Sequence, residues 1–357
     1  MIKVNMFSSA DKVKGQGVGS AYLELIRLLQ EQAKDEIEMT INRYQKTQLS
    51  HYHTIDPLFY LTTFFRKRFG RRIGYVHFVP NTLKESIKIP KFAEKILDWY
   101  VVSFYKRMDH LVVVNPSFIP ELVALGIDEA NITYIPNFVA QSTFYAYSPN
   151  EIAELRKEEG LADDKFVVFG AGQVQERKGV FDFATLAEEM PDVQFIWAGG
   201  FSFGKITDGY ERYKKLMDHP PENLKFVGII DRKKMVDYYN LANVFTTASH
   251  TETQGLTVIE AMAASLPVVC LDDESFRSVV EDSNTGFLFK DDLEYVKYMN
   301  KLISDSDYCK KMGVKARKSS EKFSSKYFAE SVLKVYKLAI RKKKNKYLKK
   351  KKNVKKV

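Results

Sequence analysis

Short apolar runs alternate with amphipathic helical patterns along almost the whole of this 357-residue chain. Such alternation is typical of βαβ units, whose strands lie parallel in one sheet. A first set of strands is predicted at residues 2–7, 37–41, 73–79, 111–114 and 132–135. A second set is predicted at residues 166–170, 193–198, 224–227, 244–247, 267–270 and 287–289. The pattern therefore predicts an α/β fold with two parallel sheets.

The stretch from 137 to 148 separates the two sets, because it is aromatic and polar and has no helical period. A chain of this length also exceeds the size at which one hydrophobic core usually stops growing. We therefore expect two domains, an N-terminal domain and a C-terminal domain, then a helix and a basic tail, at residues 1–140, 141–325, 326–340 and 341–357. The helix that opens the C-terminal domain is expected to begin after an N-cap at Asn150.

The strongest motif follows the strand at 244–247, where Glu252 and Glu260 lie eight positions apart. Gly255 permits a tight turn into the helix that carries Glu260. The start of that helix then presents the backbone amides of Gly255, Leu256 and Thr257. Because a helix N-terminus favours anions, these amides are candidates for binding a diphosphate. Two glutamates at this spacing also occur by chance, but the loop-to-helix context favours a ligand site.

The segment from Glu252 through the following AMAASLPVV resembles the donor site of family-four retaining glycosyltransferases of the GT-B fold. The resemblance implies that Glu252 contacts the transferred sugar and that Glu260 holds the nucleotide ribose. It also implies two doubly wound, Rossmann-like domains that face each other across a cleft. Finally, it implies transfer with retention of configuration, without a metal ion and without a cofactor.

A second glycine-rich segment, FGAGQVQERKG at 169–179, opens the C-terminal domain directly after a strand. It is similar to the family's Gly-Arg-x-x-x-x-Lys-Gly pattern, which implies that Lys178 binds the donor diphosphate. Gln173 stands at the family's arginine position and cannot supply the charge that stabilises a departing diphosphate. Arg177 either compensates from beside Lys178 or points into solvent, and the sequence leaves both open.

Two features of the N-terminal domain are further candidates. The loop after the first strand carries Gly15, Gly17 and Gly19, whereas a tight turn needs only one glycine, so close approach to a ligand is favoured. The resemblance implies that this loop approaches the donor phosphates and the acceptor. His77 lies near the end of the strand at 73–79, and a lone histidine is more often structural. The family has a histidine at the corresponding point that contacts the sugar, which makes His77 a candidate.

The formal net charge of +10 comes from the tail, because residues 341–357 alone carry eleven Lys and Arg and no acid. Such a block predicts a disordered arm that binds either nucleic acid or an anionic bilayer. The basic excess lies outside the predicted domains, and no stacking motif of the RNA-binding type is present. We therefore expect no nucleic-acid partner and favour an anionic membrane surface.

A second basic cluster lies in the N-terminal domain, where residues 64–72 combine three aromatic residues with Arg66, Lys67, Arg68, Arg71 and Arg72. Basic residues attract anionic lipid, and aromatic residues settle at the headgroup level. The helix predicted at 91–108 has a stripe of Phe92, Ile96, Trp99, Tyr100 and Phe104. This stripe predicts either packing on the sheet or contact with lipid, for which Trp99 is the candidate.

Across the chain, from MFSSADKVKGQGVGS to the Glu252 segment, the sequence is similar to bacterial hexosyltransferases that extend monoglucosyl-diacylglycerol. The similarity implies UDP-galactose or UDP-glucose as donor, a glycolipid acceptor, and a product that is a membrane glycolipid or lipoteichoic acid anchor. A soluble or polymer glycan acceptor is the alternative. Neither a signal peptide nor a run of about eighteen apolar residues is evident. Cys270 and Cys309 are expected to be reduced thiols, so a peripheral protein at the cytoplasmic side of the membrane is expected.

Overall fold

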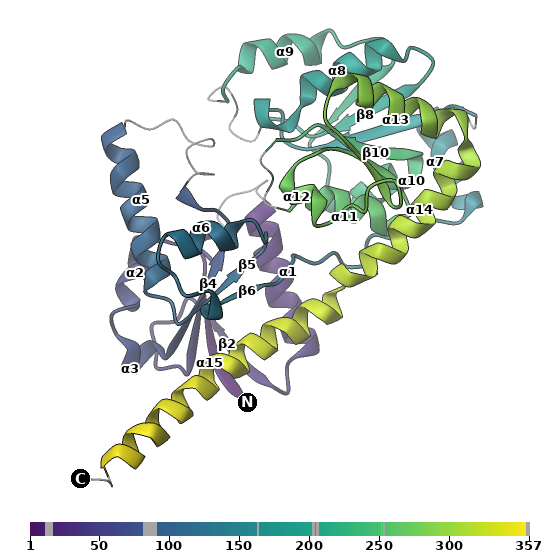
Figure 1. Ribbon diagram of the computed structural model, residues 1–357. Coiled ribbons are helices and arrows are strands. Elements are labelled where there is room, and N and C mark those ends of the chain that lie inside the picture. Colours follow the sequence, from purple (N-terminus) through teal and green to yellow (C-terminus); the bar gives the residue numbers. More distant parts are fainter. Residues whose placement is uncertain are drawn as a thin grey trace. The chain divides into compact units, whose positions relative to one another are not determined.

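The computed structural model describes residues 1–10, 17–80, 91–162, 164–201, 204, 207–250, 252 and 254–354, without the side chains of 17, 18, 20, 21, 91–93 and 342–354. The chain divides into two compact units. The first unit contains Met1–Asn137 together with Ser325–Val357, and the second unit contains Phe138–Ser324. Each unit is built on a parallel sheet with helices packed around it (Figure 1). The predicted α/β class with two parallel sheets is confirmed.

The sheet of the first unit has the strand order β2-β1-β3-β4-β5-β6, and every pairing is parallel. Its strands are β1 (Ile2–Phe7), β2 (Ile37–Ile41), β3 (Leu49–Tyr52), β4 (Arg71–Val76), β5 (His110–Val113) and β6 (Ile132–Tyr134). Strand β3 was not predicted, because its LSHY sequence has no apolar run. All four of its side chains are nevertheless buried, His51 among them.

The described helices of the first unit are α1 (Gly17–Gln32), α2 (Pro57–Thr62), α3 (Arg66–Phe69), α5 (Lys91–Lys106), α6 (Phe118–Ala124), η2 (Glu129–Asn131) and α15 (Ser325–Val354). The core includes side chains of β1, β3, β4 and α5, among them Phe7, Tyr52, Val76 and Phe104. The buried side of α5 is formed by Val101, Phe104 and Tyr105. The predicted stripe is therefore divided: Phe104 and Tyr100 pack on the core, whereas Ile96 and Trp99 are exposed.

The sheet of the second unit has the order β12-β11-β10-β7-β8-β9 and is also parallel throughout. Its strands are β7 (Val167–Ala171), β8 (Gln194–Ala198), β9 (Leu224–Gly228), β10 (Val244–Thr247), β11 (Val268–Leu271) and β12 (Gly286–Phe289). Successive residues of β7 pack into different clusters, Val167 and Phe169 in one and Val168 in the other. Both faces of this sheet are therefore buried, as expected when helices cover each side.

The described helices of the second unit are α7 (Pro149–Glu158), η3 (Glu176–Lys178), α8 (Val180–Glu189), α9 (Tyr210–Asp218), η5 (Arg232–Lys234), α10 (Met235–Leu241), α11 (Leu256–Ala263), α12 (Glu274–Arg277), α13 (Asp292–Ser304), α14 (Ser306–Ser320) and η6 (Glu321–Phe323). The N-cap of α7 is Ser148, so the prediction of Asn150 was wrong. Ser148 and Glu151 form a capping box, and Pro149 occupies the first helical turn, where its missing N–H costs nothing.

The order of the second sheet fixes where a ligand can bind. Strands β7 and β10 are neighbours, although the chain visits β8 and β9 between them. From this point the order runs outward in both directions, which makes the β7–β10 pair a topological switch point. In open α/β sheets, ligands bind beyond the carboxyl ends of the strands at such a point.

The last helix, α15, runs through the predicted basic tail as far as Val354. The expectation of a disordered arm was therefore wrong for residues 341–354. Lysine and arginine favour helix formation, and the segment from 325 to 354 contains neither glycine nor proline. In the first unit, α15 contacts α1 and β4 and buries Phe328, Val332 and Tyr336. No helix in the described ranges has the length and apolar character needed to cross a bilayer.

Candidate active site

Two loops meet at the switch point of the second sheet and bring the predicted donor residues together. Lys178 ends η3, which follows β7, and Glu252 follows β10. The Lys178 ammonium donates a hydrogen bond to Oε1 of Glu252. Ser249 Oγ donates to the same oxygen at 2.7 Å, and a guanidinium nitrogen of Arg177 lies 3.9 Å from Oε2. Two cations and one hydroxyl thus surround a single carboxylate.

Close backbone contact holds these two loops together. The carbonyl oxygen of Arg177 accepts a hydrogen bond from the His250 amide at 2.8 Å and lies 3.0 Å from the Ser249 hydroxyl, whose single proton it shares with Glu252. Gly179 has φ +63°, and a Cβ added there would lie 2.6 Å from the carbonyl oxygen of Ala248. Only glycine fits this left-handed position at such a short approach. The glycine of the ERKG sequence therefore allows Lys178 to reach Glu252.

The charges of the pair depend on its surroundings. Burial on its own would raise the pKa of the Glu252 carboxyl, but Lys178 and Arg177 outweigh that effect and hold the pKa below its usual value. Burial lowers the pKa of Lys178, and the attraction of Glu252 opposes this shift. The Glu252 carboxyl is therefore ionised at neutral pH, and its negative charge favours the protonated form of Lys178.

Arg177 points toward Glu252, whereas its compensation for Gln173 stays a prediction. Its side chain is only about one-third exposed and lies beside Glu252. When the Gln175 amide oxygen is turned toward Arg177, it accepts hydrogen bonds from Nε and Nη2 at 3.1 and 3.0 Å. Gln173 lies next to Gln175, at a distance of 3.0 Å between the two amides. The cationic charges near Glu252 thus come from Arg177 and Lys178.

The second predicted glutamate is buried at the centre of a separate polar cluster. Gly255, at φ +66°, is the N-cap of α11, and Leu256 and Thr257 form its first turn. Glu260 follows one turn later and is 2% exposed. Its Oε2 accepts a hydrogen bond from the Tyr239 hydroxyl at 2.9 Å, and its Oε1 lies 2.8 Å from an Arg232 nitrogen.

Arg232 and Tyr239 were not among the predicted site residues. Arg232 also lies over the ring of Phe144, at 5.3 Å from its centroid. The DRKK sequence that carries Arg232 is typical of a solvated turn, and the position of Tyr239 is typical of a core residue of α10. Neither has a local signal that connects it to Glu260, which lies more than twenty residues away in the chain.

His77 and the glycine loop belong to the first unit. His77 follows β4 directly, is 6% exposed, and packs against His53 with 4.3 Å between ring centroids. Burial lowers the pKa of His77 to about 4, so its imidazole is neutral at physiological pH. Gly17 begins α1, Gly19 is buried within it, and Gly15 lies outside the described residues.

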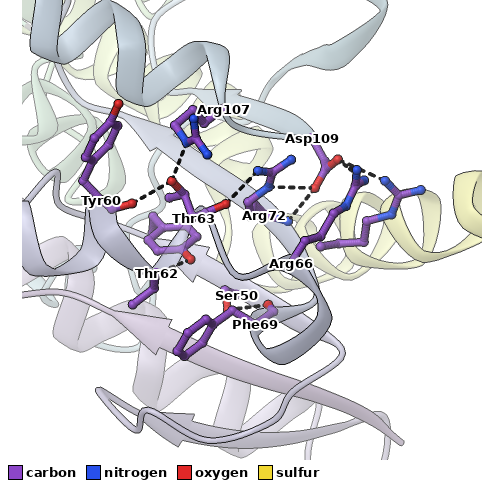
Figure 2. Close-up of polar contacts among 11 residues, drawn as sticks. Ser50, Tyr60, Thr62, Thr63, Arg66, Phe69, Arg72, Arg107 and Asp109 are labelled. Carbon is purple, nitrogen blue, oxygen red and sulfur yellow. Dashed lines mark hydrogen bonds and ion pairs between the residues drawn. The ribbon is translucent and has the colours of Figure 1, made fainter.

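The basic segment of the first unit is organised around Asp109 (Figure 2). Arg66, Arg71 and Arg72 all form ion pairs with this carboxylate, the latter two at 3.0 and 3.2 Å. The Arg71 and Arg72 side chains are only 12% and 14% exposed and hold the start of β4 to Asp109, which does not favour them as membrane contacts. Arg66 remains half exposed, and Lys67 and Arg68 are exposed.

Comparison with known proteins identifies a family that matches this arrangement. Residues 151–319 match the family described as Glycosyl transferases group 1. The alpha-galactosylglucosyldiacylglycerol synthase of Streptococcus pneumoniae is 50% identical over 280 residues, which cover 78% of this chain and 75% of that protein. The alpha-monoglucosyldiacylglycerol synthase of Acholeplasma laidlawii is 27% identical over 283 residues, 78% of this chain and 69% of that protein.

Solved structures show the same fold. Anabaena Alr3699/HepE in complex with UDP-glucose superposes with a TM-score of 0.75 at 17% identity, over 94% of this chain and all of that one. Sucrose-phosphate synthase from Thermosynechococcus elongatus gives a TM-score of 0.78 at 16% identity, over 95% of this chain and 99% of that one. At these identities the likeness supports the two-domain GT-B fold and nothing finer.

Proposed function

Since this chain belongs to the group 1 glycosyl transferases, we propose that it transfers galactose or glucose from a UDP-sugar to monoglucosyl-diacylglycerol. The product would be a dihexosyl-diacylglycerol, a membrane glycolipid that can serve as a lipoteichoic acid anchor. The observation that carries the proposal is the Lys178–Glu252 pair at the switch point of the second sheet. The names of the relatives from Streptococcus pneumoniae and Acholeplasma laidlawii support the lipid acceptor.

Each part of the donor then has a proposed partner in the second unit. Lys178, Arg177 and the first-turn amides of α11 would hold the diphosphate, because cations and a helix N-terminus stabilise the charge that develops as it departs. Glu252 would contact the transferred hexose. Glu260 would hold the ribose hydroxyls, with Arg232 and Tyr239 fixing its carboxylate. From the first unit, His77 would contact the sugar as a neutral hydrogen-bonding group.

Retention of configuration follows if the acceptor hydroxyl attacks from the face that the diphosphate leaves. The bond from the anomeric carbon to the phosphate oxygen breaks as the bond to the acceptor oxygen forms, through an oxocarbenium-like state. The departing phosphate oxygen accepts the proton of the acceptor hydroxyl. The cations beside Glu252 would stabilise this leaving group throughout.

The function can be tested with the purified enzyme, monoglucosyl-diacylglycerol and each UDP-hexose in turn. We expect a dihexosyl lipid in the organic phase, identified by mass spectrometry, with one of the two donors strongly preferred. Transfer to a water-soluble glycan, with no lipid product from either donor, would favour the alternative acceptor class.

Chelation provides a second test of the proposed chemistry. In the described part of the chain, no group of three His, Cys, Asp or Glu side chains could hold a metal ion. Because Lys178 and Arg177 would supply the charge on the diphosphate, we expect activity to survive excess EDTA. Loss of activity that manganese restores would overturn the metal-independent mechanism.

We also propose that the enzyme works at the cytoplasmic face of the membrane and that the tail recruits it. Each tail cation contributes about 1 kcal/mol at best near an anionic bilayer, and less as salt rises. Deletion of residues 341–357 should reduce binding to anionic vesicles at least about tenfold. UDP affinity and thermal stability should stay nearly unchanged, because the buried residues of α15, such as Tyr336, precede the cut.

A second variant keeps the tail but removes its charge: each lysine and arginine of 341–357 is replaced by glutamine. It should lose vesicle binding as the deletion does. Equal vesicle binding by the deleted and full-length chains at several salt concentrations would exclude the tail as an anchor. Tighter binding to duplex DNA than to anionic vesicles at matched salt would revive the nucleic-acid alternative.

A further inference from the structure

Six large apolar side chains are exposed on helices α2 and α5 of the first unit and on the segment that follows α2. Leu58 and Leu61 lie on α2, Phe64 and Phe65 follow it, and Ile96 and Trp99 lie on α5. Each is more than half exposed, and Trp99 reaches 66%. Scattered apolar residues are normal on a protein surface, but six on two adjacent helices and the segment after one of them indicate an interaction site. We call these six residues the α2–α5 surface.

The two helices pack directly against each other, so these side chains share one region of the first unit. The Tyr60 hydroxyl of α2 lies 2.8 Å from the Ser103 hydroxyl of α5, and the rings of Tyr60 and Tyr100 are 5.3 Å apart. The Arg107 guanidinium lies 3.4 Å from the centre of the Phe64 ring, and its Nε donates to Thr63 Oγ1 at 2.7 Å. These contacts hold Phe64 in place while more than half of it stays exposed.

The exposed charges next to the α2–α5 surface are basic, whereas Asp56, the N-cap of α2, is partly buried and accepts hydrogen bonds from Ser9 and Thr54. Residues 64–68 contain Arg66, Lys67 and Arg68 and no acid. The nearby carboxylate of Asp109 is only 13% exposed and already pairs with three arginines (Figure 2). The acids of α5, Glu94 and Asp98, are partly buried, whereas Lys95 and Lys106 are exposed. An apolar patch flanked by exposed cations complements an anionic bilayer, where apolar groups enter the acyl region and cations meet phosphates.

We propose that the α2–α5 surface inserts into the headgroup and upper acyl region of an anionic membrane, with Arg66, Lys67 and Arg68 at the lipid phosphates. The inference rests on the proposed function, because a glycolipid acceptor must be taken from a bilayer. It differs from recruitment by the tail, which is electrostatic and acts at a distance. The surface makes an apolar contact that salt does not abolish.

The chain offers an intrinsic reporter, because it has two tryptophans. Trp99 is 66% exposed on the α2–α5 surface, whereas Trp197 is 1% exposed inside the second unit. With vesicles of phosphatidylglycerol and phosphatidylcholine, Trp99 emission should shift to the blue and be quenched by lipids brominated on the upper acyl chain. Trp99→Phe should abolish both changes and leave the Trp197 signal.

Affinity is tested with Leu61→Ser combined with Phe65→Ser, both at exposed positions where folding should be unaffected. We expect vesicle affinity to fall about tenfold or more at salt high enough to screen the tail. Leu293→Ser combined with Val314→Ser is the matched control, since both side chains are exposed in the second unit. This control should bind vesicles like the wild type. UDP affinity should be equal in all three proteins.

The outcomes separate this inference from the proposed function. Glycolipid synthesis without any change in Trp99 emission on vesicles would overturn the inference and leave the function standing. Insertion of Trp99 into vesicles, with no transfer from any UDP-hexose, would overturn the proposed function and leave the membrane contact standing. A blue shift that needs no vesicles and grows with protein concentration would assign the surface to a second copy of the chain, and would also overturn it.

Discussion

Replacing Lys178 with methionine is expected to slow the chemical step by about 2 to 4 kcal/mol, on the order of 30- to 1,000-fold in kcat. The proposed role of this ammonium is to stabilise the charge that develops on the departing diphosphate. Methionine keeps most of the side-chain volume and removes the charge and the hydrogen-bond donors of the ammonium. Single-turnover rates at saturating donor and acceptor measure the effect. Lys225→Met is the control, because that lysine is exposed on β9 and pairs with Glu159, away from the Lys178–Glu252 pair.

A structural side effect of this substitution must be separated from the catalytic one. Without Lys178, the Glu252 carboxylate stays largely buried beside Arg177 alone, and an uncompensated buried charge destabilises a fold. We therefore expect Lys178→Met to lower the melting temperature, and Glu252→Gln in the same chain to restore part of it. The double variant should stay inactive. A Lys178→Met enzyme with wild-type kcat would remove Lys178 from the proposed mechanism.

The same pair gives a pH dependence of stability. The folded-state pKa of Glu252 lies below its ordinary value, so its ionised form adds stability above the unfolded pKa, near 4.5. This contribution is lost as the pH falls through the lower folded-state value. Glu252→Gln should therefore flatten the decline of stability below about pH 4.5. Urea unfolding across that range would detect the difference.

The second large effect is expected at Glu260, where glutamine should weaken UDP binding on the order of 10- to 100-fold. Hydrogen bonds to a charged group contribute about 1.5 to 3 kcal/mol, and glutamine offers the ribose one acceptor without charge. Glu260→Gln also leaves Arg232 without its partner at 2.8 Å. Calorimetric titration with UDP measures the loss directly, without turnover.

Glu252→Gln is the matched comparison, because it makes the same chemical change at the other glutamate. It should retain UDP affinity within a few-fold and lose turnover, since the proposed contact of Glu252 is to the sugar. Equal losses of UDP affinity in both variants would contradict the separate roles of the two residues. Arg232→Met should lower UDP affinity less than Glu260→Gln, because Tyr239 still holds the carboxylate at 2.9 Å.

The sequence by itself determined the features that depend on residues close together in the chain. Alternating apolar runs predicted two parallel sheets, and all six strands of the second sheet were foreseen to within a few residues. The turn at Gly255 and the start of α11 were also predicted, because glycine in a left-handed turn and the residues at a helix start follow local conformational preferences. Strand β3 was missed because its burial depends on neighbouring strands and not on its own LSHY sequence.

Only the tertiary structure decided which distant groups meet. It brought Lys178 to Glu252 by pairing β7 with β10, and it gave Glu260 the partners Arg232 and Tyr239. In the sequence, Arg71 and Arg72 belong to one continuous basic cluster, but in the structure they pair with Asp109 and are largely buried. Trp99 is exposed because α5 packs through Val101, Phe104 and Tyr105. The physical reason is common to all of these: a side chain's burial and charge partners are set by elements far along the chain, which local propensity does not encode.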